Sequence, residues 1–134
     1  MNQGIYCLVF NLRQNMKVQI GKRKNKDVFP KGFYCYVGSG MNNLDARINR
    51  HLSKDKNKKW HIDYLLDHAD MAGVKTILTR KKLECKTSDR VKELSDSEPA
   101  KGFGSSDCKC DAHLHYFKEN PLGDERFLSI FEIQ

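Results

Sequence analysis

The chain has 134 residues, about the length of one domain, and its 24 lysines and arginines exceed its 17 aspartates and glutamates, giving a formal charge of +7. This positive charge favours a polyanionic partner, and nucleic acid more than an anionic membrane surface. No stretch approaches the roughly 20 apolar residues that a membrane-spanning helix needs, and the first residues show no signal peptide. We therefore expect no membrane association and a cytoplasmic location.

The cysteines argue against a disulfide framework. There are five of them, an odd number in a chain without a recognisable export signal. Cys7 and Cys35 lie within apolar runs, where cysteine usually behaves as a small buried hydrophobic residue. Free thiols are the expected state.

Residues 4–10 are predicted to form the first strand, because β-branched and aromatic side chains follow one another there. Strand alternation would place Tyr6, Leu8 and Phe10 on one face and Ile5, Cys7 and Val9 on the other. Two short segments, 17–20 and 27–29, flank the polar residues 21–26 and predict a hairpin. Residues 33–37 then predict a central strand that ends at Gly38-Ser39-Gly40.

The hydrophobic period changes from two to nearly four after Asn43, which predicts a helix over 44–53 with Asn43 as its N-cap. On a helical wheel, Arg47 and His51 lie beside the apolar stripe, at the rim of a core, whereas Arg50 points outward. The stripe consists of Leu44, Ile48 and Leu52.

Two further helices and a strand are expected in the middle of the chain. A segment dense in apolar residues predicts a helix over 60–69, and the alternating residues 74–79 predict an amphipathic strand. A third helix is predicted over 83–94, with Glu84 close to its start. After a loop rich in turn-forming residues, 108–117 and 127–133 both have strand-like composition.

Several motifs occur in an order that characterises one nuclease superfamily. Gly4-Ile5-Tyr6 precedes Tyr36-Val37-Gly38, and Arg47 and His51 follow in the next predicted helix, ahead of Glu84. Their order, spacing and placement on strands and helices resemble the signature of the GIY-YIG nuclease superfamily over roughly residues 4–95. The other segments look like a little-characterised stand-alone branch that is sometimes fused to base-excision repair enzymes, namely 29–34, 60–66 and 102–108.

The resemblance implies a single α+β domain over residues 1–134, built on a small central antiparallel sheet flanked by helices, with an extra N-terminal hairpin and a C-terminal strand. It also implies an endonuclease that needs Mg²⁺ or Mn²⁺ and hydrolyses phosphodiester bonds in DNA, in preference to RNA. Repair or structure-selective processing is the expected setting, with a repair enzyme as a candidate partner.

The resemblance further assigns a role to each motif residue. Tyr6, with Tyr36 beside it, would position or deprotonate the attacking water, and Arg47 would stabilise the transition-state charge. His51 would accept a proton or touch a phosphate, and Glu84 would hold the metal ion, with Glu93 as a weaker alternative ligand. The structural alternatives are an ordinary ion pair for the arginine, a half-buried histidine, and a glutamate favoured by the helix dipole.

The chain departs from the family pattern at two places. Ser39 stands where several relatives have a lysine, and the asparagine expected beyond the glutamate has no match. Lys31, Arg50 or the basic run 54–59 are candidate substitutes for the lysine, and 105–107 for the asparagine. The predicted nucleic-acid contacts are therefore Gly38, Ser39, Lys31, Arg50, Lys54, Lys58, Lys59, Ser105 and Ser106.

Three alternatives stay open. One is a zinc site, suggested by Cys108, Cys110, His113 and His115. A Cys-x-Cys followed so soon by His-x-His would be strained in surrounding one ion. The other interpretations of this segment are a packed strand and a wall of the active site. The missing asparagine and Ser39 also suit a nucleic-acid-binding module with weak or no catalysis. The third alternative is a structural partner that docks on a repair enzyme through its 60–66 helix.

Overall fold

A four-stranded antiparallel sheet forms the centre of the molecule. The computed structural model describes residues 2–18, 27–53, 61–96 and 113–132. The strand order is β5-β1-β4-β6. The central strands are β1 (Gly4–Leu12) and β4 (Gly32–Gly40), and the edge strands are β5 (Asp70–Leu78) and β6 (Leu114–Phe117). Every pairing between neighbours is antiparallel, which confirms the α+β class.

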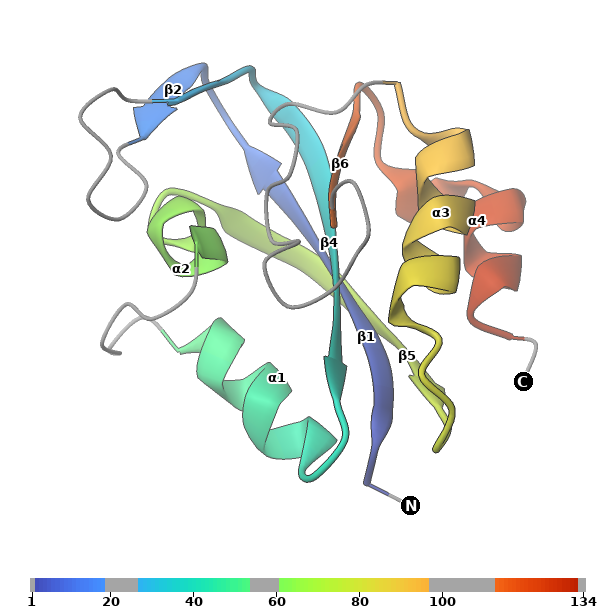
Figure 1. Cartoon of the computed structure of the whole chain (residues 1–134). Helices are drawn as coiled ribbons and strands as arrows, with labels where there is room; N and C mark the ends of the chain where they lie inside the picture. Colours follow the sequence, from blue (N-terminus) through green and yellow to red (C-terminus); the bar gives the residue numbers. More distant parts are fainter. Residues whose placement is uncertain (1, 19–26, 54–60, 97–112, 133–134) are drawn as a thin grey trace.

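Helices cover both faces of this sheet, as Figure 1 shows. One face carries α1 (Leu44–Leu52) and α2 (His61–Leu66), and the other carries α3 (Glu84–Leu94) and α4 (Glu125–Ile130). A 3-10 turn, η2, covers Pro121–Gly123. Among the described residues, no helix combines the length and the apolar character needed to cross a bilayer.

The N-terminal hairpin is present as a separate two-stranded sheet. Strands β2 (Met16–Val18) and β3 (Asp27–Phe29) pair in antiparallel fashion, with Met16 opposite Phe29. The predicted tip, 21–26, lies outside the described residues. Phe29 is fully buried and joins the core under α2, so the hairpin is anchored to the domain.

The sheet separates two hydrophobic clusters, and the alternation predicted for β1 is confirmed. Tyr6, Leu8 and Phe10 belong to the cluster on the α1 and α2 side. Ile5, Cys7 and Val9 belong to the cluster on the α3 and α4 side. Burying both faces of β1 and β4 holds their backbones rigidly, so a side chain at the end of either strand has a well-defined position.

Helix α1 begins where the sequence predicts. The side chain of Asn43 accepts a hydrogen bond from the backbone N–H of Ala46 at 3.0 Å, as an N-cap should. Its carboxamide oxygen also accepts from the Asn2 side chain at 2.8 Å, which ties the helix start to the residues ahead of β1. The N-terminal ends of α1 and β1 are therefore fixed to each other.

Two element predictions need correction. The β-prone segment 127–133 is not a strand, because 125–130 form helix α4, capped by the Asp124 side chain. Phe127, Ile130 and Phe131 recur at helical spacing and pack into the α3-side cluster, and this tertiary packing overrides the strand propensity of the residues. Strand β5 starts at Asp70, earlier than predicted, because it continues to pair with β1 beyond a register shift at Val9/Phe10.

The cysteines are only partly as expected. Cys7 and Cys35 are free and buried. Cys85, near the start of α3, is disulfide-bonded, with its partner outside the described residues, so the expectation of free thiols is wrong at this position. An odd number of cysteines carries no information about which thiols the fold brings together.

Candidate active site

Tyr6 occupies a place that only a glycine neighbour allows. It lies opposite Gly38 in the pairing of β1 with β4. A Cβ atom at residue 38 would collide with the hydroxyl and ring of Tyr6. The Gly-Ile-Tyr and Tyr-Val-Gly motifs are therefore linked sterically, since the glycine of the second makes room for the tyrosine of the first.

The predicted aromatic residues gather around the Tyr6 hydroxyl. The Tyr6 oxygen lies 2.8 Å from Nε2 of His51, which α1 supplies, and both side chains are buried. The Tyr36 ring, from β4, has its centroid 6.5 Å from that of Tyr6 and 6.1 Å from that of His51. Three residues from three elements thus form one cluster, as the sequence predicts.

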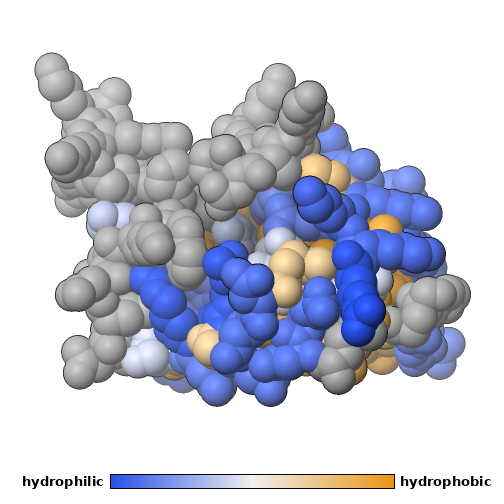
Figure 2. Space-filling model, turned by 60° about the horizontal axis from the view of Figure 1, so that its bottom comes forward, coloured by the Kyte–Doolittle hydropathy of each residue, from blue (hydrophilic) through white to orange (hydrophobic). Residues whose placement is uncertain are grey.

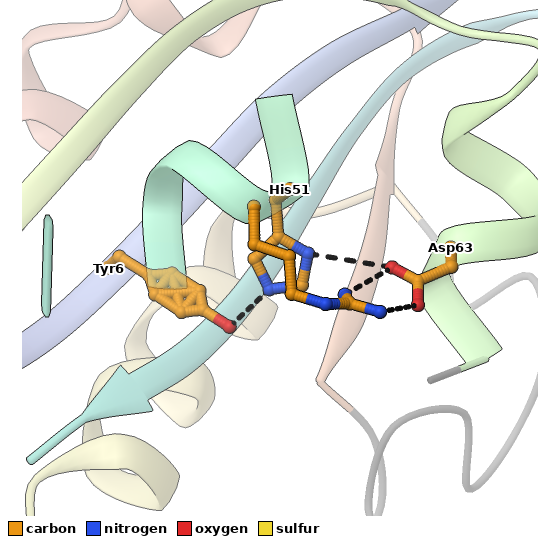
Figure 3. Close-up of polar contacts among 4 residues, drawn as sticks. Tyr6, His51 and Asp63 are labelled. Atoms are coloured by element: carbon orange, nitrogen blue, oxygen red, sulfur yellow. Dashed lines mark hydrogen bonds and ion pairs between the residues drawn. The ribbon is translucent and has the colours of Figure 1, made fainter. Parts of the chain in front are cut away.

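A buried carboxylate that the sequence analysis missed stands behind His51. Asp63 of α2 is fully buried, and its Oδ1 atom lies 3.8 Å from Nδ1 of His51. Arg50 forms two bonds to the same carboxylate, Nη1 to Oδ1 at 3.1 Å and Nη2 to Oδ2 at 3.0 Å. Figure 3 shows Tyr6, His51 and Asp63 in a row with the imidazole in the middle. Asp63 is one acidic residue among many in the sequence, and no motif distinguished it.

Arg50 does not point away from the molecule as the helical wheel suggested. Its side chain is only 26% exposed and turns toward α2, because the buried charge of Asp63 needs a cation beside it. The wheel describes one helix in isolation and cannot include a partner on the next helix.

Charges near Tyr6 act on its pKa in opposite directions. Burial is the largest influence and raises the pKa of the phenol. Arg47 lowers it, through its charge and a hydrogen bond, whereas the charges of Glu84 and Asp63 raise it. Tyr6 is therefore a protonated phenol at neutral pH, and Arg47 and Glu84 both lie close enough for their charges to affect it.

Arg47 lines a cavity of about 460 Å³ at the end of β4 and the start of α1. Its Nη1 atom donates to the backbone oxygen of Ser39 at 3.0 Å, which holds the guanidinium at the end of β4. The cavity is lined by Ser39, Gly40, Met41, Asn42, Asn43, Ala46, Arg47 and Arg50. Figure 2 faces this end of the molecule and shows a mostly hydrophilic surface around a small apolar area.

Glu84 is the first residue of α3, which covers the face of the sheet opposite to α1 (Figure 1). Its side chain is 18% exposed, and Oε2 lies 3.2 Å from Nδ1 of the buried His113. No group of three or more histidine, cysteine, aspartate or glutamate side chains suited to a metal ion occurs in the part of the chain that the structure describes. A single, partly exposed carboxylate still suits Mg²⁺ or Mn²⁺, which take most of their ligands from water and phosphate oxygens. Glu93 is exposed near the other end of α3, about 13 Å along the helix axis, and so is the poorer ligand.

One comparison with known proteins gave a match. The model of the family described as domain of unknown function DUF123 matches residues 5–133. The chain belongs to the DUF123 family. No curated protein and no solved structure matches it.

In this DUF123 domain, the two described histidines of the suggested zinc cluster each have a protein partner. His113 pairs with Glu84, and Nε2 of His115 lies 2.7 Å from the Ser88 hydroxyl of α3. Burial, together with the charges of His113 and Lys92, lowers the pKa of His115 to about 4. Cys108 and Cys110 lie outside the described residues.

The structure does not bring all the predicted nucleic-acid contacts of the DUF123 domain together. Gly38 and Ser39 lie beside Tyr6 and Arg47, but Lys31 precedes the opposite end of β4, where its backbone oxygen accepts from Tyr116. Lys31 is therefore badly placed to replace the family lysine. Other predicted contacts lie outside the described residues, namely Lys54, Lys58, Lys59, Ser105 and Ser106.

Proposed function

We propose that this DUF123 domain is a GIY-YIG-type endonuclease that uses Mg²⁺ or Mn²⁺ to hydrolyse phosphodiester bonds in DNA, in repair or in structure-selective processing. One observation carries the proposal. The hydroxyl of Tyr6 is bonded to His51 and lies within the electrostatic reach of both Arg47 and Glu84. These four side chains come from β1, α1 and α3, and packing a core alone does not require this combination of groups.

Hydrolysis of a phosphodiester requires an activated water and stabilisation of negative charge on the phosphoryl oxygens. Tyr6 is protonated at neutral pH, so its oxygen can accept a proton from water only if the hydroxyl proton of Tyr6 leaves at the same time. His51 lies at hydrogen-bonding distance to receive that hydroxyl proton. Arg47 lines the cavity at the end of β4, and its planar guanidinium is suited to binding a phosphate by two parallel hydrogen bonds. The geometry supports both roles, as does the family resemblance.

A divalent cation would be held by Glu84. One of its oxygens contacts His113, so the metal ion would take the other oxygen or displace the histidine. When bound, such a cation supplies charge neutralisation at the phosphate. Arg47, whose charge also acts on Tyr6, supplies positive charge from the protein itself.

The proposal is tested by incubating branched, nicked and single-stranded DNA with the protein and Mg²⁺ or Mn²⁺. We expect cleavage by the wild type and a loss of about 100-fold or more in both Glu84→Ala and Arg47→Ala, since each removes a charge that compensates the transition state.

Glu93→Ala is the matched control, because it removes the same charge from an exposed position of the same helix. It should cleave like the wild type. Activity that survives both Glu84→Ala and Arg47→Ala would overturn the proposed mechanism.

A nucleic-acid-binding module without catalysis is the second candidate. Two observations favour it, the protonated state of the buried Tyr6 and the engagement of Glu84 by His113. This candidate predicts tight DNA binding without cleavage, unaffected by Mg²⁺ and by Glu84→Ala. Docking through the 60–66 helix is less favoured, because Ile62, Leu65 and Leu66 are buried in the core.

A further inference from the structure

Burying an ionised carboxylate is unfavourable, because removing a charged group from water costs several kcal/mol in proteins. A carboxylate that is nevertheless fully buried calls for a structural or functional explanation. Asp63 is 0% exposed in α2. Arg50 compensates its charge through two hydrogen bonds. An apolar residue at 63 would fill the core without needing any cation, so the fold keeps a charge where packing does not require one. The carboxylate is directed at His51 as well as at Arg50, and this suggests its role.

We propose that Asp63, held by Arg50, is a positioning residue that keeps His51 in the tautomer with its proton on Nδ1, so that Nε2 accepts the proton of the Tyr6 hydroxyl. The assignment of the tautomer rests on contacts alone. Its use in a reaction rests on the proposed function.

The charges around the imidazole favour this tautomer. The Tyr6 hydroxyl, from β1, faces Nε2, and the Tyr36 ring, from β4, lies against the imidazole. Asp63, from α2, faces Nδ1, and Arg50 on the histidine's own helix binds that carboxylate. At 3.8 Å, Oδ1 is too far from Nδ1 for a good hydrogen bond, so the carboxylate acts mainly through its field. A negative charge on the Nδ1 side stabilises an N–H pointing toward it and leaves the lone pair on Nε2.

This arrangement completes a path for one proton. The attacking water would give a proton to the Tyr6 oxygen while the Tyr6 proton passes to Nε2 of His51. The resulting hydroxide forms the bond to phosphorus, the bond from phosphorus to the 3′ oxygen breaks, and the departing 3′ oxygen takes a proton from solvent. His51 then carries a positive charge beside the Asp63 carboxylate, which stabilises it until the proton returns to solvent.

The tautomer of His51 is measured directly by long-range ¹H–¹⁵N NMR of the imidazole in the full chain, without any substrate. We expect the Nδ1–H form in the wild type, and at least a tenfold fall in its ratio to the Nε2–H form in Asp63→Asn. Asp45→Asn is the control, since it removes an exposed carboxylate from α1 itself, and it should leave the ratio unchanged. An Nε2–H form in the wild type, or the same ratio in Asp63→Asn, overturns the proposal.

Asp63→Asn leaves Arg50 without its carboxylate and can unfold the domain. The double variant Arg50→Gln with Asp63→Asn removes both charges and avoids this problem. It should show the same loss of the Nδ1–H form, and retention of that form in the folded double variant also overturns the proposal.

Cleavage kinetics supply the functional readout. In Asp63→Asn we expect kcat to fall about 100-fold with KM within threefold, because general acid–base catalysis contributes about 10²–10⁴-fold and substrate binding does not involve this side chain. Loss of the carboxylate also lowers the pKa of His51, so the acid limb of the pH profile should move to lower pH. A merely structural role would reduce activity at every pH without moving that limb. If the wild type does not cleave DNA at all, the proposed function fails, while the NMR experiment still decides the role of Asp63.

Discussion

At the scale of single residues, the site depends on the lack of a side chain at Gly38 as much as on the side chains of its other residues. Gly38 lies under the Tyr6 ring, and no larger residue fits there without displacing it. The glycine therefore sets where the Tyr6 hydroxyl lies relative to His51, although it has no chemistry of its own. This steric dependence accounts for a glycine in the second tripeptide opposite the tyrosine of the first.

We predict that Gly38→Ala separates the Tyr6 hydroxyl from His51. Cleavage should fall about 100-fold, and the overpacking should lower the free energy of unfolding by about 1–3 kcal/mol. DNA cleavage and urea unfolding measure the two effects. Gly123→Ala is the control, because an added Cβ there meets nothing within 4 Å, and it should change neither quantity. Normal cleavage by Gly38→Ala would contradict the steric link.

At the scale of elements, a polar contact joins strand β6 to helix α3. Ser88 and His115 are buried, and their side chains lie 2.7 Å apart inside the face that α3 and α4 cover. The neighbouring His113 contacts Glu84 at the start of the same helix. β6 and α3 thus support the carboxylate that would hold the metal ion.

The burial of His115 predicts a pH dependence of stability. The pKa of His115 is lowered to about 4 from an ordinary value of 6.5, so below 6.5 the unfolded chain binds a proton that the folded chain does not. Its contribution to stability is fully present above pH 6.5 and is lost as the pH falls toward 4, by about 3 kcal/mol in total. Urea unfolding between pH 7 and 4 should show this loss, and His115→Leu should reduce it. His68 is exposed, so His68→Gln should leave this loss of stability unchanged. The same pH dependence in the wild type, His115→Leu and His68→Gln would show that His115 is not its source.

At the scale of the whole molecule, the positive charge of +7 predicts DNA binding that weakens with salt. If the protein neutralises about four phosphates, the logarithm of the binding constant should fall against the logarithm of salt concentration with a slope of about −3.6. Replacing Lys54, Lys58 and Lys59 with glutamine should reduce the slope by about 2.7, if these residues contact phosphates as the sequence predicts. Fluorescence anisotropy over a range of salt concentrations measures both values. Lys118→Gln, just beyond β6, should leave the slope unchanged, and an unchanged slope in the triple variant would remove that basic run from the interface.

The sequence by itself determined the elements and the motif residues of the site. Apolar periodicity is local, so it located β1, β4, α1 and α3 and the two faces of β1, and the order of the motifs brought Tyr6, Tyr36, Arg47 and His51 into one expected site. Local propensity failed at 127–133, where packing against the sheet made a helix from strand-like residues.

Only the tertiary structure decided which charged groups meet. The pairing of Asp63 with Arg50 and His51, and of His113 with Glu84, joins residues from different parts of the chain. No periodicity or spacing encodes such contacts, because they depend on the angles at which helices pack on the sheet. The position of Asp63 behind His51 follows from the packing of α2 against α1 and β1. In the proposed mechanism, this position holds the His51 proton on Nδ1 and leaves Nε2 to accept the proton of Tyr6.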